Sequence, residues 1–248
     1  MQMIYLSPHL DDVALSCGGL IWEQTQAGQS VEIWTICAGD PPPGSLSPLA
    51  EELHRRWGVG REAPSQRRDE DIQSCTILGC NYRHFEIPDA IYRRHPKTGE
   101  ALYYSDETIL GEPAKSENRL IRTITTEIKI HLPENPILVS PITLGNHVDH
   151  QITRAAVERM NVPLAFYADY PYIENHAEEL PMRIPPRYQV KIHPISNKGI
   201  KAWQDSITAH KTQISTFWKD ERVMRQAITR YHHEFGGIPL WVPINPAK

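Results

Sequence analysis

The sequence has little cysteine and no excess of charge of one sign. It contains four cysteines in 248 residues, and no two of them have the C-x-x-C spacing that is typical of redox motifs and structural zinc sites. We therefore expect small buried thiols in a reducing compartment. The formal net charge is −4, which gives no electrostatic reason to expect nucleic acid or an anionic membrane surface as a partner.

Segments that would place the chain in a membrane are also missing. No apolar stretch reaches the ~20 residues that a transmembrane helix needs. Residues 1–5 lead directly into a predicted strand, without the basic and apolar regions of a secretory signal. These observations predict a soluble, cytoplasmic protein without a membrane span.

A glycine-rich phosphate loop is absent after the first predicted strand, so we do not expect a nucleotide cofactor. What is present is an ordinary globular composition, with 40% hydrophobic and 23% charged residues, which argues against wholesale disorder. The length suits one large domain with a substantial core and leaves little room for a second.

Strand and helix patterns alternate along the chain. Residues 3–7 and 31–38 have the apolar, β-branched character of buried strands, and residues 12–27 between them have helical spacing. Such a strand–helix–strand unit is typical of parallel βαβ folds. We predict a Rossmann-like α/β fold, a mostly parallel sheet with helices on both faces, forming a single domain over residues 1–248 that includes residues 171–248.

The remaining predicted elements continue this alternation. Strands are predicted at residues 85–87, 136–140, 164–168 and 188–195, helices at residues 49–57, 65–79, 115–131, 146–160, 196–217 and 220–232, and an extended tail at residues 238–246. Residues 39–48 and 89–113 are irregular and rich in turn-forming residues. Because long irregular loops near strand ends are usually functional, we expect both to rim the binding pocket and to set substrate choice.

Polar side chains are concentrated after the first predicted strand, where His9, Asp11 and Asp12 occupy four positions. Two adjacent carboxylates repel each other and are costly to bury unless a cation lies between them or they take separate roles. A histidine nitrogen and one aspartate oxygen suit zinc, while the second aspartate can act on a water molecule. The alternative is that Asp11 or Asp12 only caps the helix that follows.

A second cluster, His147, Asp149 and His150, follows the fourth predicted strand. Histidines three apart at the start of a helix lie roughly on one face. Catalytic zinc needs three protein ligands, so either histidine completes a set with the first cluster and the other faces the substrate. Asp149 then orients an imidazole. In the alternative, Asn146 caps the helix and forms a capping box with Asp149.

These motifs resemble those of the PIG-L/LmbE family of metal-dependent de-N-acetylases. The resemblance covers about residues 3–170 and is carried by the following motifs: Pro8-His9-Leu10-Asp11-Asp12, Gly18-Gly19, Arg67-x-x-Glu70, Leu78-Gly79 and His147-Val148-Asp149-His150. Members of that family remove acetyl groups from N-acetylglucosaminyl lipids, thiol-precursor glycosides and some antibiotics. Leu10 and Val13 replace a proline and a glutamate of the family's usual motif, which leaves the metal-binding atoms intact.

The resemblance implies a role for each matching residue. The zinc ligands are matched by His9, Asp12 and His150. Asp11 matches the general base, and His147 matches the histidine that stabilises the oxyanion or protonates the leaving amine. Asp149 matches the orienting carboxylate; if it hydrogen-bonds the imidazole of His147, it raises the pKa of that ring. The implied cofactor is Zn²⁺, with Fe²⁺ or another divalent metal as the alternative.

Three further residues are candidates for substrate binding. Arg67 contacts substrate hydroxyls, as the family's helix arginine does, or is simply surface charge. Asp40 lies at a strand end beside the proline-rich loop, where it binds sugar or is an ordinary loop aspartate. Asp89, with Arg93, lines the site from the irregular segment.

The combined motifs predict a hydrolase acting on a small-molecule N-acetylated amino sugar or glycoside. One alternative is a metallo-amidase acting on a non-sugar amide or ester. Another is a catalytically silent module that binds metal or sugar, although such a module has no use for a second, unliganded carboxylate at Asp11. Homo-oligomerisation is left open by these patterns.

Overall fold

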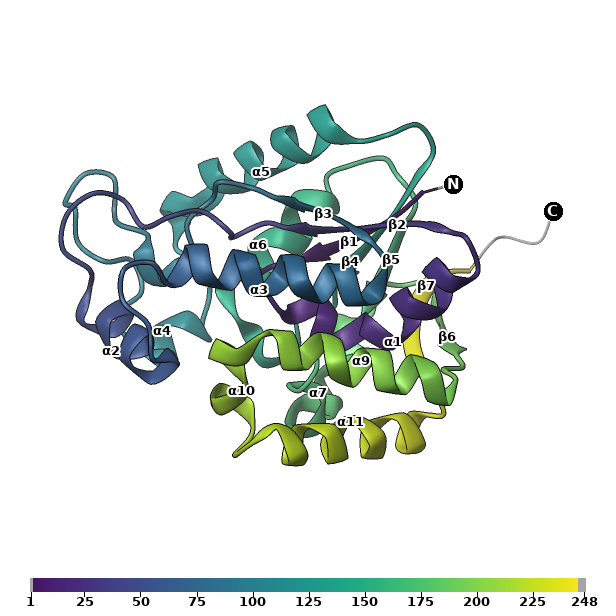
Figure 1. The fold of residues 1–248 in the computed structure, drawn as a ribbon. Helices are drawn as coiled ribbons and strands as arrows, with labels where there is room; N and C mark the ends of the chain where they lie inside the picture. The colour runs from purple at the N-terminus through teal and green to yellow at the C-terminus, as the bar shows by residue number, and fades with distance from the viewer. Residues whose placement is uncertain (1, 245–248) are drawn as a thin grey trace.

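The computed structural model describes residues 2–244, and its centre is a single sheet (Figure 1). The strands are β1 (Gln2–Ser7), β2 (Ser30–Thr35), β3 (Asn81–His84), β4 (Pro136–Pro141), β5 (Leu164–Tyr167), β6 (Tyr188–His193) and β7 (Ile238–Pro243). Their order in the sheet is β3-β2-β1-β4-β5-β7-β6. The first five strands are parallel, and β7 runs antiparallel to both of its neighbours. The predicted mostly parallel α/β fold is confirmed.

Helices cover both faces of this sheet (Figure 1). One face is covered by α1 (Asp12–Gln26), α3 (Ala63–Leu78) and α9 (Asn197–Ala209), with α11 (Glu221–Phe235) packed outside α9, and the other by α5 (Asn118–His131) and α6 (Val148–Val157). This division follows from the right-handed crossover rule, because the chain moves one way from β1 to β3 and the other way from β4 to β5. No helix among residues 2–244 is long and apolar enough to cross a membrane.

Shorter elements lie between these layers. The α-helices are α2 (Pro48–Trp57), α4 (Asp106–Ile109), α7 (Ile173–His176), α8 (Leu180–Arg183) and α10 (Lys211–Phe217), and single 3₁₀ turns occur at Ala90–Tyr92, Lys115–Glu117, Leu144–Asn146 and Ala177–Glu179. Most of them gather at the carboxyl ends of β1 and β4. The strand order reverses between these two neighbours, and ligands of open α/β sheets bind in the crevice at such a point.

Two predicted elements differ from the observed ones. The strand predicted at residues 85–87 is wrong, because the edge strand β3 ends at His84. Beyond it the chain makes only isolated bridges, at Glu86 and Pro88, although Phe85 and Ile87 are buried. The helix predicted at residues 196–217 is interrupted at His210, where the backbone leaves helical geometry between α9 and α10. Of the predicted tail, residues 245 and 246 lie outside the described residues.

Candidate active site

The turn after β1 carries three of the predicted site residues. The hydroxyl of Ser7 organises it, donating to the His9 carbonyl at 2.6 Å and accepting from the Val13 N–H at 3.1 Å. Asp12 Oδ2 then lies 2.8 Å from the His9 backbone nitrogen and 3.1 Å from His9 Nδ1. Asp11 stands at the N-cap position of α1, but its buried side chain makes no capping hydrogen bond. Helix capping therefore does not explain the Asp11 carboxylate.

The segment after β4 brings two histidines to the same place. Gly145 has a φ of 74°, which lets the chain turn sharply before α6. His150 Nδ1 donates to Asp169 Oδ1 at 2.6 Å, so in the neutral ring the other nitrogen carries the lone pair. That atom, His150 Nε2, makes no hydrogen bond and lies 3.3 Å from Asp12 Oδ2. The ring of His147 lies 4.6 Å from the ring of His9, centroid to centroid.

The start of α6 differs from the predicted capping box. His147, rather than Asn146, is the N-cap residue, and its Nδ1 accepts from the Asp149 N–H at 3.1 Å. Asn146 has a φ of 60° and turns its amide to the carbonyls of Leu110 and Gly111. The prediction that Asn146 and Asp149 cap each other is wrong, because Asn146 is held by the neighbouring loop.

The carboxylate of Asp149 contacts His9 and not the predicted His147. Its Oδ2 lies 3.0 Å from His9 Nε2 and 2.9 Å from the Ala90 backbone nitrogen, and its Oδ1 lies 2.5 Å from an Arg93 terminal nitrogen. The remaining nitrogens of Arg93 face Glu117 at 2.5 and 3.2 Å. Since a carboxylate only accepts, His9 Nε2 is the donor, and the contact turns Nδ1 toward Asp12 and His150.

Burial and neighbouring charges shift the pKa values of Asp11 and Asp12 in opposite directions. Desolvation, followed by the charge of Asp12, raises the pKa of Asp11 to about 6. Burial would also raise the pKa of Asp12, but the charges and hydrogen bonds of His150 and His9 hold it well below its usual range. Asp12 therefore stays ionised, whereas Asp11 can exchange a proton near neutral pH.

These residues fit a divalent cation. Nitrogens of His9, His147 and His150 lie within 4.8 Å of one another. His150 Nε2 is buried and makes no hydrogen bond, which costs free energy unless a cation binds there. Without a cation, burial lowers the pKa of His9 and of His150, but the surrounding carboxylates outweigh it and raise both, that of His150 to about 10. The cluster therefore attracts positive charge, as a metal site does.

The predicted substrate-binding residues have different positions. Arg67 is buried, with terminal nitrogens 3.6 Å from Asp11 Oδ1 and 3.9 Å from Asp89 Oδ2, so the alternative of surface charge is wrong for it. Asp89 is also buried and lies 3.7 Å from His9 Nε2. Asp40 is instead exposed, pairs with Arg68 at 3.0 Å and does not line the site cavity.

A cavity of about 240 Å³ opens above these residues. Besides the predicted residues, its walls come from α2, the 3₁₀ turn at Ala90–Tyr92, α4, the start of α7 and α10: Leu53, Arg56, Trp57, Ile91, Asp106, Ile109, Leu110, Tyr172, Gln213, Thr216 and Phe217. Part of the irregular segment 89–113 thus lines the cavity. The wall is largely apolar, with charged groups gathered at the floor, which is the usual composition of a small-molecule site.

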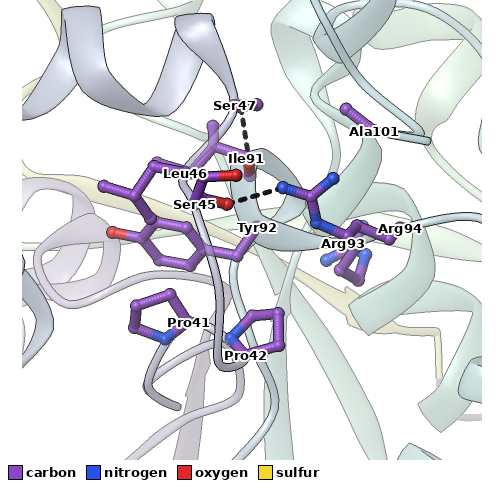
Figure 2. Close-up of a pocket in the computed structure, with 10 residues that line it drawn as sticks. All are labelled: Pro41, Pro42, Ser45, Leu46, Ser47, Ile91, Tyr92, Arg93, Arg94 and Ala101. Carbon is purple, nitrogen blue, oxygen red and sulfur yellow. Dashed lines mark hydrogen bonds between the residues drawn. The ribbon is translucent and has the colours of Figure 1, made fainter. Parts of the chain in front are cut away.

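The proline-rich loop, residues 39–48, does not line this cavity. Figure 2 shows it packed on the segment that follows Asp89. The void between them has a volume of about 10 Å³. Arg94 donates to the Ser45 carbonyl at 2.7 Å, and Ser47 donates to the Ile91 carbonyl at 3.2 Å. The prediction that this loop rims the pocket is wrong, because these bonds hold it behind the wall.

Some residues of the site were not predicted. Asp169, which directs His150, lies two residues after β5, so its position near a strand end was a usable signal. Glu117 was not predicted either; it pairs with Arg93, which was predicted to line the site but instead lies buried behind Asp149 and does not line the cavity. Tyr172 and Phe217 reach the cavity from segments without any recognised motif, and no sequence pattern indicated them.

The fold and the site together define a metal-dependent hydrolase built on a Rossmann-like sheet, with two imidazoles and a carboxylate at the strand ends and a second carboxylate beside them. Residues 4–161 match the family model of the GlcNAc-PI de-N-acetylases, PIG-L. The chain belongs to this family, and the resemblance found in its motifs is confirmed.

Two relatives have assigned activities. The chain is similar to a 2′-N-acetylparomamine deacetylase of Niallia circulans, with 30% identity over 71% of this chain and 70% of the relative. It is also similar to a 2′-N-acetylparomamine deacetylase of Streptomyces fradiae, with 29% identity over 69% of this chain and 57% of that protein's length.

Crystal structures with the same fold include other deacetylases. A deacetylase–teicoplanin complex has a TM-score of 0.79 and 24% identity over 100% of both chains. The zinc-inhibited form of teicoplanin deacetylase has a TM-score of 0.77 and 24% identity over 98% of this chain and 97% of that one. An A40926 pseudoaglycone deacetylase has a TM-score of 0.71 and 26% identity over 100% and 99% of the chains.

Proposed function

We propose that this protein hydrolyses the acetamido group of an N-acetylglucosamine-type amino sugar or glycoside, releasing acetate. One observation carries the proposal: the buried Asp11 lies directly beside the His9–Asp12–His150 cluster, yet its carboxylate makes no hydrogen bond or ion pair with either histidine and faces Arg67 instead. A carboxylate placed there, with its pKa raised to about 6, is suited to general base catalysis. The family and the deacetylases described above support the same reaction.

The metal ligands in this proposal are His9 Nδ1, Asp12 Oδ2 and His150 Nε2, with zinc as the expected metal and Fe²⁺ or another divalent ion as the alternative. When bound, such a cation supplies Lewis-acid chemistry, polarising the acetyl carbonyl and lowering the pKa of water. Asp149 and Asp169 hold the two imidazoles in the orientation that presents these lone pairs.

Asp11 takes the proton of the attacking water in this proposal. Arg67, 3.6 Å away, keeps the carboxylate oriented and compensates part of its charge. Attack at the acetyl carbon forms a tetrahedral oxyanion, and breakage of the C–N bond then requires a proton on the departing nitrogen. Asp11, protonated in the first step, donates it, so acetic acid and a free amine leave, the acid loses its proton to solvent as acetate, and the Asp11 carboxylate is regenerated.

His147 is suited to stabilise the oxyanion as a neutral donor. Its Nδ1 accepts the Asp149 N–H, so its ring hydrogen is on Nε2. Burial, followed by the charge of His9, lowers its pKa well below the ordinary value for histidine. A neutral imidazole that donates one hydrogen bond stabilises a developing oxyanion without itself losing the proton.

The test is acetate release from a panel of N-acetylglucosaminides by the metal-loaded protein. The proposal expects turnover, and expects His9→Ala, Asp12→Ala and His150→Ala to lower metal content whereas His147→Ala retains it. Turnover of non-sugar amides alone would favour the metallo-amidase. Tight metal binding without any turnover would favour the silent module.

We also propose a cytoplasmic location. The four cysteines are free, and three of them are buried. Free buried thiols are typical of proteins in reducing compartments.

A further inference from the structure

A network of buried polar groups lies behind the proposed metal ligands. It begins at Asp149 and continues through Arg93 and Glu117 to Tyr103. Each of these side chains is at most 8% exposed, and none of them lines the site cavity. Since a buried charge costs free energy unless it is paired and hydrogen-bonded, the orientation of each group in the network depends on how its neighbours share their contacts.

Arg93 gives most of its donor nitrogens to Glu117. Its Nε and Nη2 lie 2.5 and 3.2 Å from the two carboxylate oxygens of Glu117, which is the paired geometry that guanidinium and carboxylate groups favour. Only Nη1 is left, and it lies 2.5 Å from Asp149 Oδ1 and 3.2 Å from the Pro88 carbonyl oxygen. Burial alone would lower the pKa of Arg93, but the surrounding carboxylates outweigh it and raise this pKa, so the guanidinium stays charged.

Glu117 is held in place by groups other than Arg93. The Tyr103 hydroxyl donates to Glu117 Oε2 and accepts from the Ala114 N–H at 3.0 Å. Burial raises the pKa of this hydroxyl, which therefore keeps its hydrogen. The backbone of Glu117 belongs to the 3₁₀ turn Lys115–Glu117, directly before α5. The Glu117 carboxylate is thus a fixed point to which the guanidinium attaches.

This arrangement leaves one oxygen of Asp149 for His9. Asp149 Oδ2 lies 3.0 Å from His9 Nε2 and 2.9 Å from the Ala90 backbone nitrogen, whereas Arg93 reaches only Oδ1. A guanidinium without a second carboxylate can turn its paired nitrogens onto both oxygens of the first. Without Glu117, Arg93 would therefore compete with the His9 ring for Oδ2.

We propose that Glu117 is a positioning residue for the metal site. By occupying Nε and Nη2 of Arg93, it reserves Asp149 Oδ2 for another donor. That donor is His9 Nε2, and the contact keeps His9 Nδ1 directed toward Asp12 and the proposed metal position. The inference rests on the proposed function, because that function requires a metal at His9.

The test replaces Glu117 with glutamine and measures both zinc binding and the His9 ring. The Glu117→Gln side chain has nearly the same shape, but its amide nitrogen donates instead of accepting, so it cannot hold both nitrogens of Arg93. The matched control is Glu221→Gln, which removes the same charge from the Glu221–Arg225 pair of α11, away from the site cavity. Competition with a fluorescent chelator gives the Kd for Zn²⁺, and NMR of nitrogen-labelled histidine follows solvent exchange of the His9 Nε2 hydrogen.

We expect Glu117→Gln to raise the Kd for Zn²⁺ about tenfold, as loss of a partner behind a metal ligand does, and to speed exchange of the Nε2 hydrogen. The control should change neither quantity. An unchanged Kd in Glu117→Gln would overturn the proposal. A raised Kd with unchanged exchange would also overturn it, because the loss of a negative charge would then explain the weaker binding without any effect on the ring.

Thermal unfolding shows whether Glu117→Gln is folded. If it is not, Arg93→Lys decides the question, because lysine keeps the positive charge but has a single nitrogen in place of the planar fork. The Kd should then rise by a similar factor with faster exchange of the His9 hydrogen, and unchanged values would overturn the proposal. If the unaltered protein does not bind zinc, the proposed function fails separately, and the exchange of the His9 hydrogen in the metal-free proteins still decides the role of Glu117.

Discussion

At the scale of single residues, adjacent aspartates acquire different roles from their partners. Asp12 is 3.1 Å from His9 Nδ1 and 3.3 Å from His150 Nε2, and these imidazoles keep it ionised. Asp11, one residue earlier, faces Arg67 at the longer distance of 3.6 Å. Asp12, which pairs closely with two imidazoles, is therefore suited to be a metal ligand. Asp11, which is paired only loosely, is suited to be a general base.

We expect Asp11→Asn to retain metal and fold but to lower kcat by about 10²–10⁴, the usual contribution of general acid–base groups. The base acts when ionised, so activity of the unaltered protein should fall as the pH falls through the pKa of Asp11, about 6 without a bound cation. A cation would lower this pKa, which places the acid limb at or below about pH 6. Metal analysis checks that Asp11→Asn keeps its metal, and a pH–rate profile locates the acid limb. A near-normal kcat in Asp11→Asn would show that Asp11 is not the general base.

At the scale of elements, the wall of the cavity depends on how α2 is anchored. Ser47 caps this helix, accepting from the Ala50 N–H at 3.2 Å and donating to the Ile91 carbonyl at 3.2 Å. Leu53 and Trp57 of the same helix line the cavity, and Trp57 lies 4.8 Å from the Arg67 guanidinium. One hydroxyl thus joins the cap of a helix to the segment that carries Asp89.

We expect Ser47→Ala to lower the free energy of unfolding by about 1 kcal/mol, as loss of an N-cap does. Because the freed helix carries part of the cavity wall, KM should rise with kcat nearly unchanged. The matched control is Ser196→Ala, which removes the cap of α9, a helix that does not line the cavity. Denaturant unfolding and steady-state kinetics measure both; an equal KM rise in the two variants would contradict the local explanation.

At the scale of the whole molecule, the C-terminal third is built into the same core as the motifs. β7 lies between β5 and β6 in the sheet. Trp203 of α9 is fully buried and donates to the Leu15 carbonyl of α1 at 3.0 Å. A side chain at Gly18 would lie 2.7 Å from its ring, which gives a packing reason for this glycine. The packing supports our proposal that the chain is one domain.

Trp203→Ala should therefore lower the free energy of unfolding by about 3–5 kcal/mol, the usual effect of truncating a buried tryptophan. Because the helices share one core, the whole chain should still unfold in a single step. Unfolding followed by far-UV circular dichroism and by tyrosine fluorescence should give one coincident transition. The control is Tyr104→Ala, at a 70% exposed side chain, with little expected effect. Two separated transitions would instead indicate that the C-terminal helices form their own unit.

The local pattern of the sequence determined the class of fold and the position of the chemistry. Apolar periodicity identified β1, α1 and β2 within a few residues of their observed bounds. Since parallel strands end on one edge of a sheet, the residues after β1 and β4 could be expected to meet although they are far apart in the chain. His9, Asp12 and His150 do meet there.

Only the tertiary structure decided which partners these residues have. Asp149 directs His9 rather than His147, because Arg93 and the Ala90 N–H hold its carboxylate on that side. The proline-rich loop packs behind the cavity, and Phe217 enters it from a segment without a motif. The spacing of residues determines toward which face of its own helix or strand a side chain points. Which residue it contacts on another element depends on how the helices pack against the sheet, and the pattern of one segment does not contain this information.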